Sequence, residues 1–293
     1  MKLALGTVQF GIDYGISNRQ GKVVLHEVEN ILSLARAHGI TTLDTAAAYG
    51  DSEQAIGTLN ASSGFSIVTK IPTLAKVTST ISDLLEISLA HLKTKQVQAL
   101  MFHSAKDLLG AKGEHYYQQA SILKQQGKIN QLGVSVYNPK QLDKLMQKFD
   151  LDIVQVPLNC MDQRFTNTEL RQQLQTKKIE VHVRSVFLQG LLLMPLPELA
   201  PYFQPFHPQL NSFHALCKQL NCQALTLALS IIHQNPFINK AVIGCCSTQQ
   251  LEQIIEHYYL AKKLSKTHKN AIAQLSCSNE ALINPSNWSI QYK

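Results

Sequence analysis

The sequence contains no long hydrophobic run, although apolar residues make up 45% of its 293 positions. Its most apolar stretches, 188–194 and 224–232, are much shorter than the roughly 18 residues that a membrane-spanning helix needs. The apolar run at the N-terminus is also too short for a signal peptide, because Gln9 and Asp13 follow soon after it. These absences predict a cytoplasmic chain that does not enter a membrane.

Patterns that would indicate a metal site or a disulfide framework are missing as well. Six cysteines are present, but none has CxxC spacing, and Cys245 and Cys246 are adjacent. The eleven histidines form no HxH or HxxxH pattern. Reduced thiols in a cytosolic chain are therefore the favoured interpretation, with metal binding as the minor alternative. We expect no metal.

The net charge of +7 permits nucleic-acid binding but does not argue for it, because most basic residues are scattered. The exception is a cluster at Lys262, Lys263, Lys266 and Lys269, where a long helix is expected to end. Cations at that position complement the helix dipole. A solvated helix end is favoured over a nucleic-acid patch, so we expect no nucleic-acid partner.

Eight short apolar, β-branched runs alternate with longer amphipathic segments, which is typical of a single-domain (β/α)8 TIM barrel. A doubly wound Rossmann sheet is the alternative, but it would need a GxGxxG motif after an early strand, and none is present. We expect one domain over 1–293, with a loop at 191–208, two helices before the last strand, and a tail at 264–293 that packs over the barrel. The expected strands are 2–5, 41–44, 66–69, 97–102, 131–134, 153–156, 180–183 and 241–243.

Reactive side chains follow three consecutive predicted strands. Asp44 ends the second strand, Tyr49 lies five residues further on, Lys70 ends the third strand, and His103 follows the fourth. Barrels of this class build their active sites at these strand ends. A lysine lowers the pKa of a nearby phenol, a carboxylate keeps that lysine charged, and a histidine can hydrogen-bond to a carbonyl oxygen. Each residue alone has a structural explanation, but together they predict a catalytic site.

The segments around these residues resemble the aldo-keto reductase family, and the resemblance covers nearly the whole chain. The family's DTAxxYG-xSE signature is similar to residues 44–53, and further motifs are similar to residues 68–70, 100–103, 132–135 and 154–159. The resemblance implies reduction of a small-molecule carbonyl compound, with Tyr49 as the general acid, Lys70 and Asp44 tuning it, and His103 orienting the carbonyl. It also implies a nicotinamide cofactor, NADP being the family's usual choice and NAD the alternative.

The resemblance further implies where the cofactor binds. Ser135 and Gln155 would hold the nicotinamide carboxamide, and the adenosine end would lie at the start of the last large helix, where amide groups bind anions. Arg184 would contact the pyrophosphate or stack on the cofactor, with a salt bridge at the rim of the core as the alternative. The complete set is Ser135, Gln155, Arg184, Ser185, Gly244, Ser247, Gln250 and Gln253.

Two departures from the family pattern concern the cofactor. The family usually places a lysine or arginine where it can pair with the 2′-phosphate of NADP, but this sequence has no cation between Gly244 and Gln253. We therefore expect weaker discrimination between NADPH and NADH than the family usually shows. Val136 also stands where many members have asparagine, and Asn138 is the nearest candidate to replace that side chain.

The substrate is less clearly indicated. Residues 6–18 and 284–288 resemble a bacterial subgroup associated with sugar and surface-polysaccharide pathways, which implies a keto-sugar or a sugar aldehyde. Two other functions stay open: a non-catalytic nicotinamide sensor on the same scaffold, and a Schiff-base aldolase in which Lys70 would have to be neutral. The candidates for the pocket are Val8, Gln9, Phe10, Tyr14, the 188–206 loop and the tail near Trp288.

Overall fold

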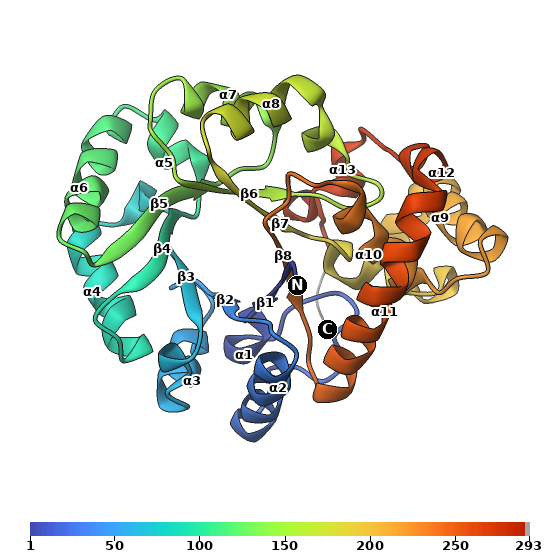
Figure 1. Ribbon diagram of the computed structural model, residues 1–293, viewed down its shortest axis with the longest axis horizontal. Helices are drawn as coiled ribbons and strands as arrows, with labels where there is room; N and C mark the ends of the chain where they lie inside the picture. The colour runs from blue at the N-terminus through green and yellow to red at the C-terminus, as the bar shows by residue number, and fades with distance from the viewer. Residues whose placement is uncertain (291–293) are drawn as a thin grey trace.

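The computed structural model describes residues 1–290 and consists of a closed barrel of eight parallel strands in the order β1 to β8 (Figure 1). Pairing of Leu3 with Ala241 and of Gly6 with Gly244 closes the barrel between β1 and β8. The (β/α)8 fold expected from the sequence is confirmed. The strands are β1 (Leu3–Gly6), β2 (Thr42–Asp44), β3 (Ser66–Ile71), β4 (Val97–Phe102), β5 (Ile129–Ser135), β6 (Ile153–Pro157), β7 (Glu180–Arg184) and β8 (Lys240–Gly244).

The helices surround the barrel (Figure 1). The apolar periodicity at 28–35 and 81–92 predicts buried helix faces, and α2 and α4 bury those positions. The helices are α1 (Val8–Gly11), α2 (Leu25–Ala37), α3 (Ser52–Thr58), α4 (Ile81–Leu92), α5 (Ala105–Leu109), α6 (Gly113–Gln125), α7 (Pro139–Met146), α8 (Thr168–Thr176), α9 (His207–Gln219), α10 (Ala224–Gln234), α11 (Thr248–Thr267), α12 (Lys269–Ala273) and α13 (Glu280–Ile283), with short 3₁₀ turns between them.

Side chains alternate between the two faces of each strand, which separates the barrel interior from the larger core under the helices. The apolar cluster inside the barrel consists of Val68, Ala99, Met101 and Ile153. Lys70, His103 and Gln155 each lie two residues after a member of this cluster. Strand alternation therefore carries their side chains inward as well, at the level where the strands end.

The strands are longer than the sequence pattern indicated at several ends. β3 runs to Ile71 rather than to 69, and β5 covers Ile129–Ser135 rather than 131–134. The added residues are polar or lie at the rim, where ladder hydrogen bonds extend the strand without requiring an apolar side chain. Apolar runs thus located each strand but underestimated the length of five of them, β3 and β5 to β8.

The segment expected to be a loop at 191–208 is more regular than the sequence suggested. It contains the 3₁₀ turns η4 (Leu188–Leu193), η5 (Leu196–Glu198) and η6 (Pro201–Phe206), and α9 already begins at His207. Pro201 lies in the first turn of η6. Proline is tolerated there because the first amide of a helical turn has no acceptor within that turn. The two expected helices before β8 are α9 and α10.

The last part of the chain begins inside α11 and continues through α12, α13 and the turn η7 (Pro285–Asn287). The Cys277 amide donates to the Met161 carbonyl over 2.8 Å, and the Tyr202 hydroxyl donates to the Ala281 carbonyl over 2.9 Å. These contacts attach the segment to the loop after β6 and to η6. The expectation for the tail extends to 293, and its last three residues lie outside the described part of the chain.

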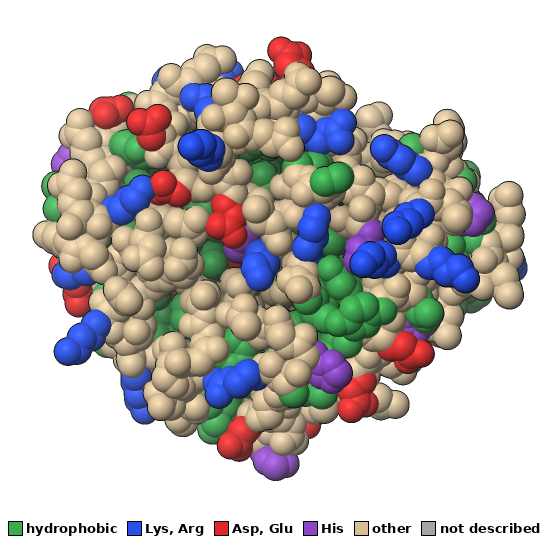
Figure 2. All heavy atoms as spheres, viewed as in Figure 1, with side chains coloured by type: hydrophobic (Ala, Val, Ile, Leu, Met, Phe, Trp, Pro, Cys, Tyr) green, Lys and Arg blue, Asp and Glu red, His purple; other side chains and the backbone are tan. Residues whose placement is uncertain are grey.

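Lysine and arginine side chains gather over the C-terminal part of α11 on the face that Figure 2 shows. Lys262, Lys263 and Lys266 belong to the last two turns of that helix, which ends at Thr267 as the sequence indicated. Within residues 1–290, no single helix has the length and apolarity to cross a membrane, and one bent pair, Pro201–Gln219 with Ala224–Gln234, meets those criteria by length and composition only.

Candidate active site

A buried ion pair lies at the C-terminal end of the barrel interior. The Lys70 Nζ donates to Asp44 Oδ1 over 2.6 Å and to the Thr45 carbonyl over 2.9 Å, and both charged side chains are almost completely buried. Burial lowers the pKa of Lys70, but the charge of Asp44 and the interaction with Tyr49 outweigh it, so the net pKa is raised. A charged lysine is a poor amine nucleophile, which argues against the Schiff-base alternative.

Tyr49 lies directly above this pair, in the loop between β2 and α3. The Lys70 Nζ is 5.1 Å from the centre of the Tyr49 ring and interacts with its hydroxyl. Two glycines hold the loop in place. A Cβ at Gly11 would lie 1.7 Å from the Tyr49 carbonyl oxygen, and Gly50 has a φ of +55°, which disfavours other residues. Gly50 belongs to the signature at residues 44–53, whereas nothing in the local sequence indicates the role of Gly11, because that role depends on the approach of two distant loops.

The net pKa shift of Tyr49 differs from the sequence-based expectation. Burial raises the pKa of the phenol, and this effect exceeds the opposing influence of Lys70. The expectation of a lowered pKa rested on the lysine alone. With its pKa raised, the phenol is protonated at neutral pH but is a weaker acid than a free tyrosine, so the charge of Lys70 is what favours release of its proton.

His103 follows the last residue of β4 and faces Tyr49. The centres of the two rings are 5.8 Å apart, and the rings meet edge to face at 81°. Burial, followed by the charge of Lys70, lowers the pKa of His103 to about 4. The imidazole is therefore neutral at physiological pH and can donate a hydrogen bond without carrying a charge. Asp44, Tyr49, Lys70 and His103 thus converge on one patch.

This patch opens into a cavity of about 640 Å³ that extends across the barrel end to the start of α11. Ligand sites typically have such volumes, with a few polar groups among apolar walls. Of the twelve predicted site residues, two do not line the cavity, namely Lys70 and Ser247. The other ten do: Asp44, Tyr49, His103, Ser135, Gln155, Arg184, Ser185, Gly244, Gln250 and Gln253.

Arg184 crosses the middle of the cavity wall from the end of β7. Its guanidinium lies 4.3 Å from the centre of the Tyr137 ring and donates to the Ser135 Oγ and to the Val136 carbonyl. No ion pair of Arg184 exists among the described residues, so the salt bridge considered for it is absent. Tyr137 was not among the predicted site residues, although it lies only two residues after Ser135.

Three of the other predicted cofactor residues, Gln155, Ser247 and Gln250, have hydrogen-bond partners within the chain. The Gln155 Nε2 donates to Asp44 Oδ2 over 2.6 Å. The Ser247 Oγ caps α11 by accepting from the Gln250 amide, and the Gln250 Oε1 accepts from the Cys246 amide. Asn138 caps α7, with its Oδ1 accepting from the Gln141 amide, so it does not replace the asparagine missing at Val136.

The structure brings some of the substrate-pocket candidates to the cavity and not others. Those that line it are Val8, Gln9 and Tyr14, together with Gln189, Gly190 and Leu193 of the loop. Phe10 is buried in the apolar core, and Trp288 packs edge to face on Phe203 at 5.0 Å. These two aromatic residues were therefore wrong candidates. The cavity has further lining residues that were not predicted, because nothing in their local sequence pattern indicates a cavity; they include Ser17, Asn18, Phe187 and Leu225.

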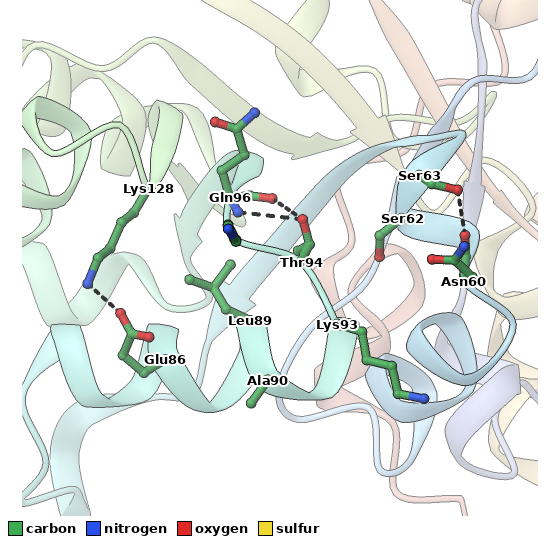
Figure 3. A pocket seen from close by; sticks show the side chains of 11 residues that line it. Asn60, Ser62, Ser63, Glu86, Leu89, Ala90, Lys93, Thr94, Gln96 and Lys128 are labelled. Carbon is green, nitrogen blue, oxygen red and sulfur yellow. Dashed lines mark hydrogen bonds and ion pairs between the residues drawn. The ribbon is translucent and has the colours of Figure 1, made fainter.

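A second, more open cavity of about 940 Å³ lies at the opposite end of the barrel, beside α4 and the starts of β4 and β5 (Figure 3). Several of its polar side chains already have partners, as in the ion pair between Lys128 and Glu86 and the bond from the Ser63 hydroxyl to the Asn60 backbone carbonyl. No catalytic group faces it, so we place the candidate site in the first cavity. Residues 1–290 contain no cluster of three or more His, Cys, Asp or Glu side chains that could hold a metal.

A parallel barrel with reactive groups at the C-terminal ends of its strands defines the class of (β/α)8 enzymes. Within that class the chain belongs to the aldo/keto reductase family, a family of carbonyl oxidoreductases, because the model of that family matches residues 2–276.

Solved structures with the same fold include an aldo-keto reductase, AKR11C1, from Bacillus halodurans in its holo form, which is 17% identical with a TM-score of 0.74, covering 98% of this chain and 94% of that one. Two chains assigned to the aldo-keto reductases from Pseudomonas aeruginosa have TM-scores of 0.65 and 0.66 at 19% and 20% identity, each covering 89% of this chain and 90% of the other. A comparison with curated protein sequences found no significant match. At these identities the structural likeness concerns the fold.

Proposed function

We propose that this chain reduces an aldehyde or ketone to an alcohol with NADPH or NADH, and that Tyr49 donates the proton. The observation that carries the proposal is the buried Lys70–Asp44 pair, which lies beneath Tyr49 and beside a neutral His103 at the wall of the cavity. These side chains provide a proton donor, a fixed positive charge behind it and a hydrogen-bond donor for a carbonyl oxygen.

The cavity suits a dinucleotide in shape and in chemistry. It extends from Tyr49 past Ser135 and Arg184 to Gln250 and Gln253, and its polar groups are distributed along that length. When bound, the nicotinamide would supply the hydride. Ser135 and Gln155 would then hold its carboxamide, and the cation of Arg184 would contact the phosphates or stack on the cofactor.

The four residues Asp44, Tyr49, Lys70 and His103 have separate tasks in this proposal. The Tyr49 hydroxyl delivers its proton to the oxygen of the substrate, and the positive charge of Lys70 stabilises the phenolate that remains. Asp44 holds Lys70 charged and fixes its direction. His103 donates a hydrogen bond to the carbonyl oxygen and thereby orients the substrate. Tyr14, Ser17, Asn18 and Gln189 provide polar groups at the cavity wall that suit a hydroxylated, sugar-derived carbonyl compound.

The test is consumption of NADPH or NADH by the purified chain with a panel of activated aldehydes, sugar aldehydes and keto-sugars. Tyr49→Phe should lower kcat/KM by about 100-fold or more and leave cofactor affinity unchanged. Tyr259→Phe, on the exposed side of α11, is the matched control and should retain full activity. Cofactor binding without turnover of any carbonyl compound would refute the proposal and favour the sensor.

A further inference from the structure

The start of α11 is already occupied by a carboxylate from a distant part of the chain. Glu27, in the first turn of α2, accepts a hydrogen bond from the Thr248 amide over 2.5 Å and another from the Thr248 hydroxyl over 2.8 Å, both at its Oε1. The Asn30 Nδ2 donates to the other oxygen of Glu27 over 3.3 Å. The bond from the Thr248 amide, followed by that from its hydroxyl, holds the pKa of Glu27 below its usual value, so its carboxyl group is ionised at neutral pH.

Two further amides of this helix start have acceptors from the chain as well. The Ser247 Oγ accepts from the Gln250 amide, and the Gln250 Oε1 accepts from the Cys246 amide over 2.7 Å. A helix N-terminus attracts anions through its free amide groups and its dipole. Here the amides of Cys246, Thr248 and Gln250 already have acceptors, and the acceptor of the Thr248 amide is an anion.

Glu27 and Thr248 do not line the cavity, but the charge of Glu27 acts on a residue that does. Cys245 and Cys246 line it, and burial raises the pKa of both thiols. The charge of Glu27 raises the pKa of Cys245 further, and that of Asp13 does the same for Cys246. No lysine or arginine stands between Gly244 and Gln253 to offset these carboxylates. Arg184 cannot do so in its present position, because it is bound at Ser135 and Tyr137.

We propose that Glu27 makes the cofactor site selective for NADH, because its carboxylate takes the place at the start of α11 that a 2′-phosphate would need. This inference rests on the proposed function, which puts the adenosine half of the cofactor at residues 244–253. A 2′-phosphate there would meet a fixed carboxylate and would find no partner cation. A 2′-hydroxyl carries no charge and avoids this repulsion, and it can also donate a hydrogen bond to a carboxylate.

The experiment measures the dissociation constants of NADH and NADPH for the apoprotein by calorimetry, at one ionic strength. NADH should bind more tightly in the unaltered chain. Glu27→Gln keeps an oxygen acceptor for Thr248 and removes the charge, so NADPH should bind about tenfold more tightly, with little change for NADH. Glu29→Gln, which changes an exposed residue of the same helix, is the control and should leave both constants unchanged.

A second measurement separates charge from altered folding. Raising the salt concentration screens charges, so it should narrow the NADH preference of the unaltered chain and have less effect on that of Glu27→Gln. The melting temperature of each apoprotein verifies that the variants are folded. Tighter binding of NADPH than NADH by the unaltered chain, or an unchanged ratio in Glu27→Gln, would overturn this inference alone. If neither cofactor binds, the proposed function fails and the inference fails with it.

Discussion

Gln155 on β6 donates a hydrogen bond from its Nε2 to Asp44 Oδ2 on β2 over 2.6 Å, across the barrel interior. The other carboxylate oxygen, Oδ1, accepts from Lys70. One buried carboxylate therefore positions both the lysine beneath Tyr49 and the amide that lines the cavity. The amide nitrogen of Gln155 is already used inside the protein, so its amide oxygen is the group that remains for a ligand.

Replacement of Gln155 by leucine should destabilise the fold, because one oxygen of a buried carboxylate would lose its donor. We expect the free energy of unfolding to fall by about 1–3 kcal/mol in a denaturant titration. Gln131→Leu is the control, since the Gln131 Nε2 donates to Glu180 over 2.8 Å in a half-buried position at the other end of the barrel. A loss at Gln155 no larger than that at Gln131 would contradict the importance assigned to the buried pair.

The low pKa of His103 predicts how turnover and the free energy of unfolding change as the pH is lowered. Its pKa is about 4 in the folded chain and 6.5 when unperturbed, so the unfolded chain takes up the proton first. The stabilisation from a neutral His103 is complete above pH 6.5 and is lost as the pH falls towards 4.

The rate of turnover should therefore not change through protonation of His103 between pH 6 and 8. The His103→Gln variant should lose less stability in acid than the unaltered chain, because it lacks the imidazole that takes up a proton on unfolding. Unfolding at several pH values, with His115→Gln on the exposed face of α6 as the control, measures that difference. A pKa near 6.5 for His103 in a proton-resonance titration would refute the assignment.

Substitution of Gly11 by alanine should displace Tyr49. The added Cβ would lie 1.7 Å from the Tyr49 carbonyl oxygen, so one of the two loops must move. A misplacement of about 1 Å in a catalytic group can cost about 100-fold in rate, and we expect kcat to fall by that order while the chain stays folded. At Gly110 the nearest atom to an added Cβ is the Lys106 carbonyl oxygen at 3.1 Å, and Gly110→Ala should remain active. Full activity of Gly11→Ala would show that Tyr49 tolerates the shift.

The stacked position of Arg184 predicts a contribution to the binding of both cofactors. Arg184→Lys keeps the charge but loses the planar group that lies on Tyr137, so NADH and NADPH should both bind about tenfold more weakly. Arg36, whose guanidinium lies 5.1 Å from the centre of the Phe65 ring, does not line the cavity, and Arg36→Lys is the matched control. An effect on NADPH alone would instead indicate that Arg184 contacts the 2′-phosphate.

The local sequence pattern was sufficient to predict the barrel and the inward direction of Asp44, Lys70 and His103. Apolar runs located the eight strands, and the strict alternation of side chains along a strand decided that Lys70 points inward. Because parallel strands of one barrel end at the same rim, residues at consecutive strand ends had to be neighbours. The convergence of Asp44, Lys70 and His103 follows from these two rules.

The contacts between distant segments depended on the tertiary structure. Glu27 meets Thr248 across 221 positions of sequence, and Gln155 meets Asp44 across 111. The sequence also could not show that burial outweighs Lys70 in shifting the pKa of Tyr49. Periodicity reports which way a side chain points along its own element, whereas its partner, its burial and its charge state depend on where barrel closure and the loops bring the rest of the chain.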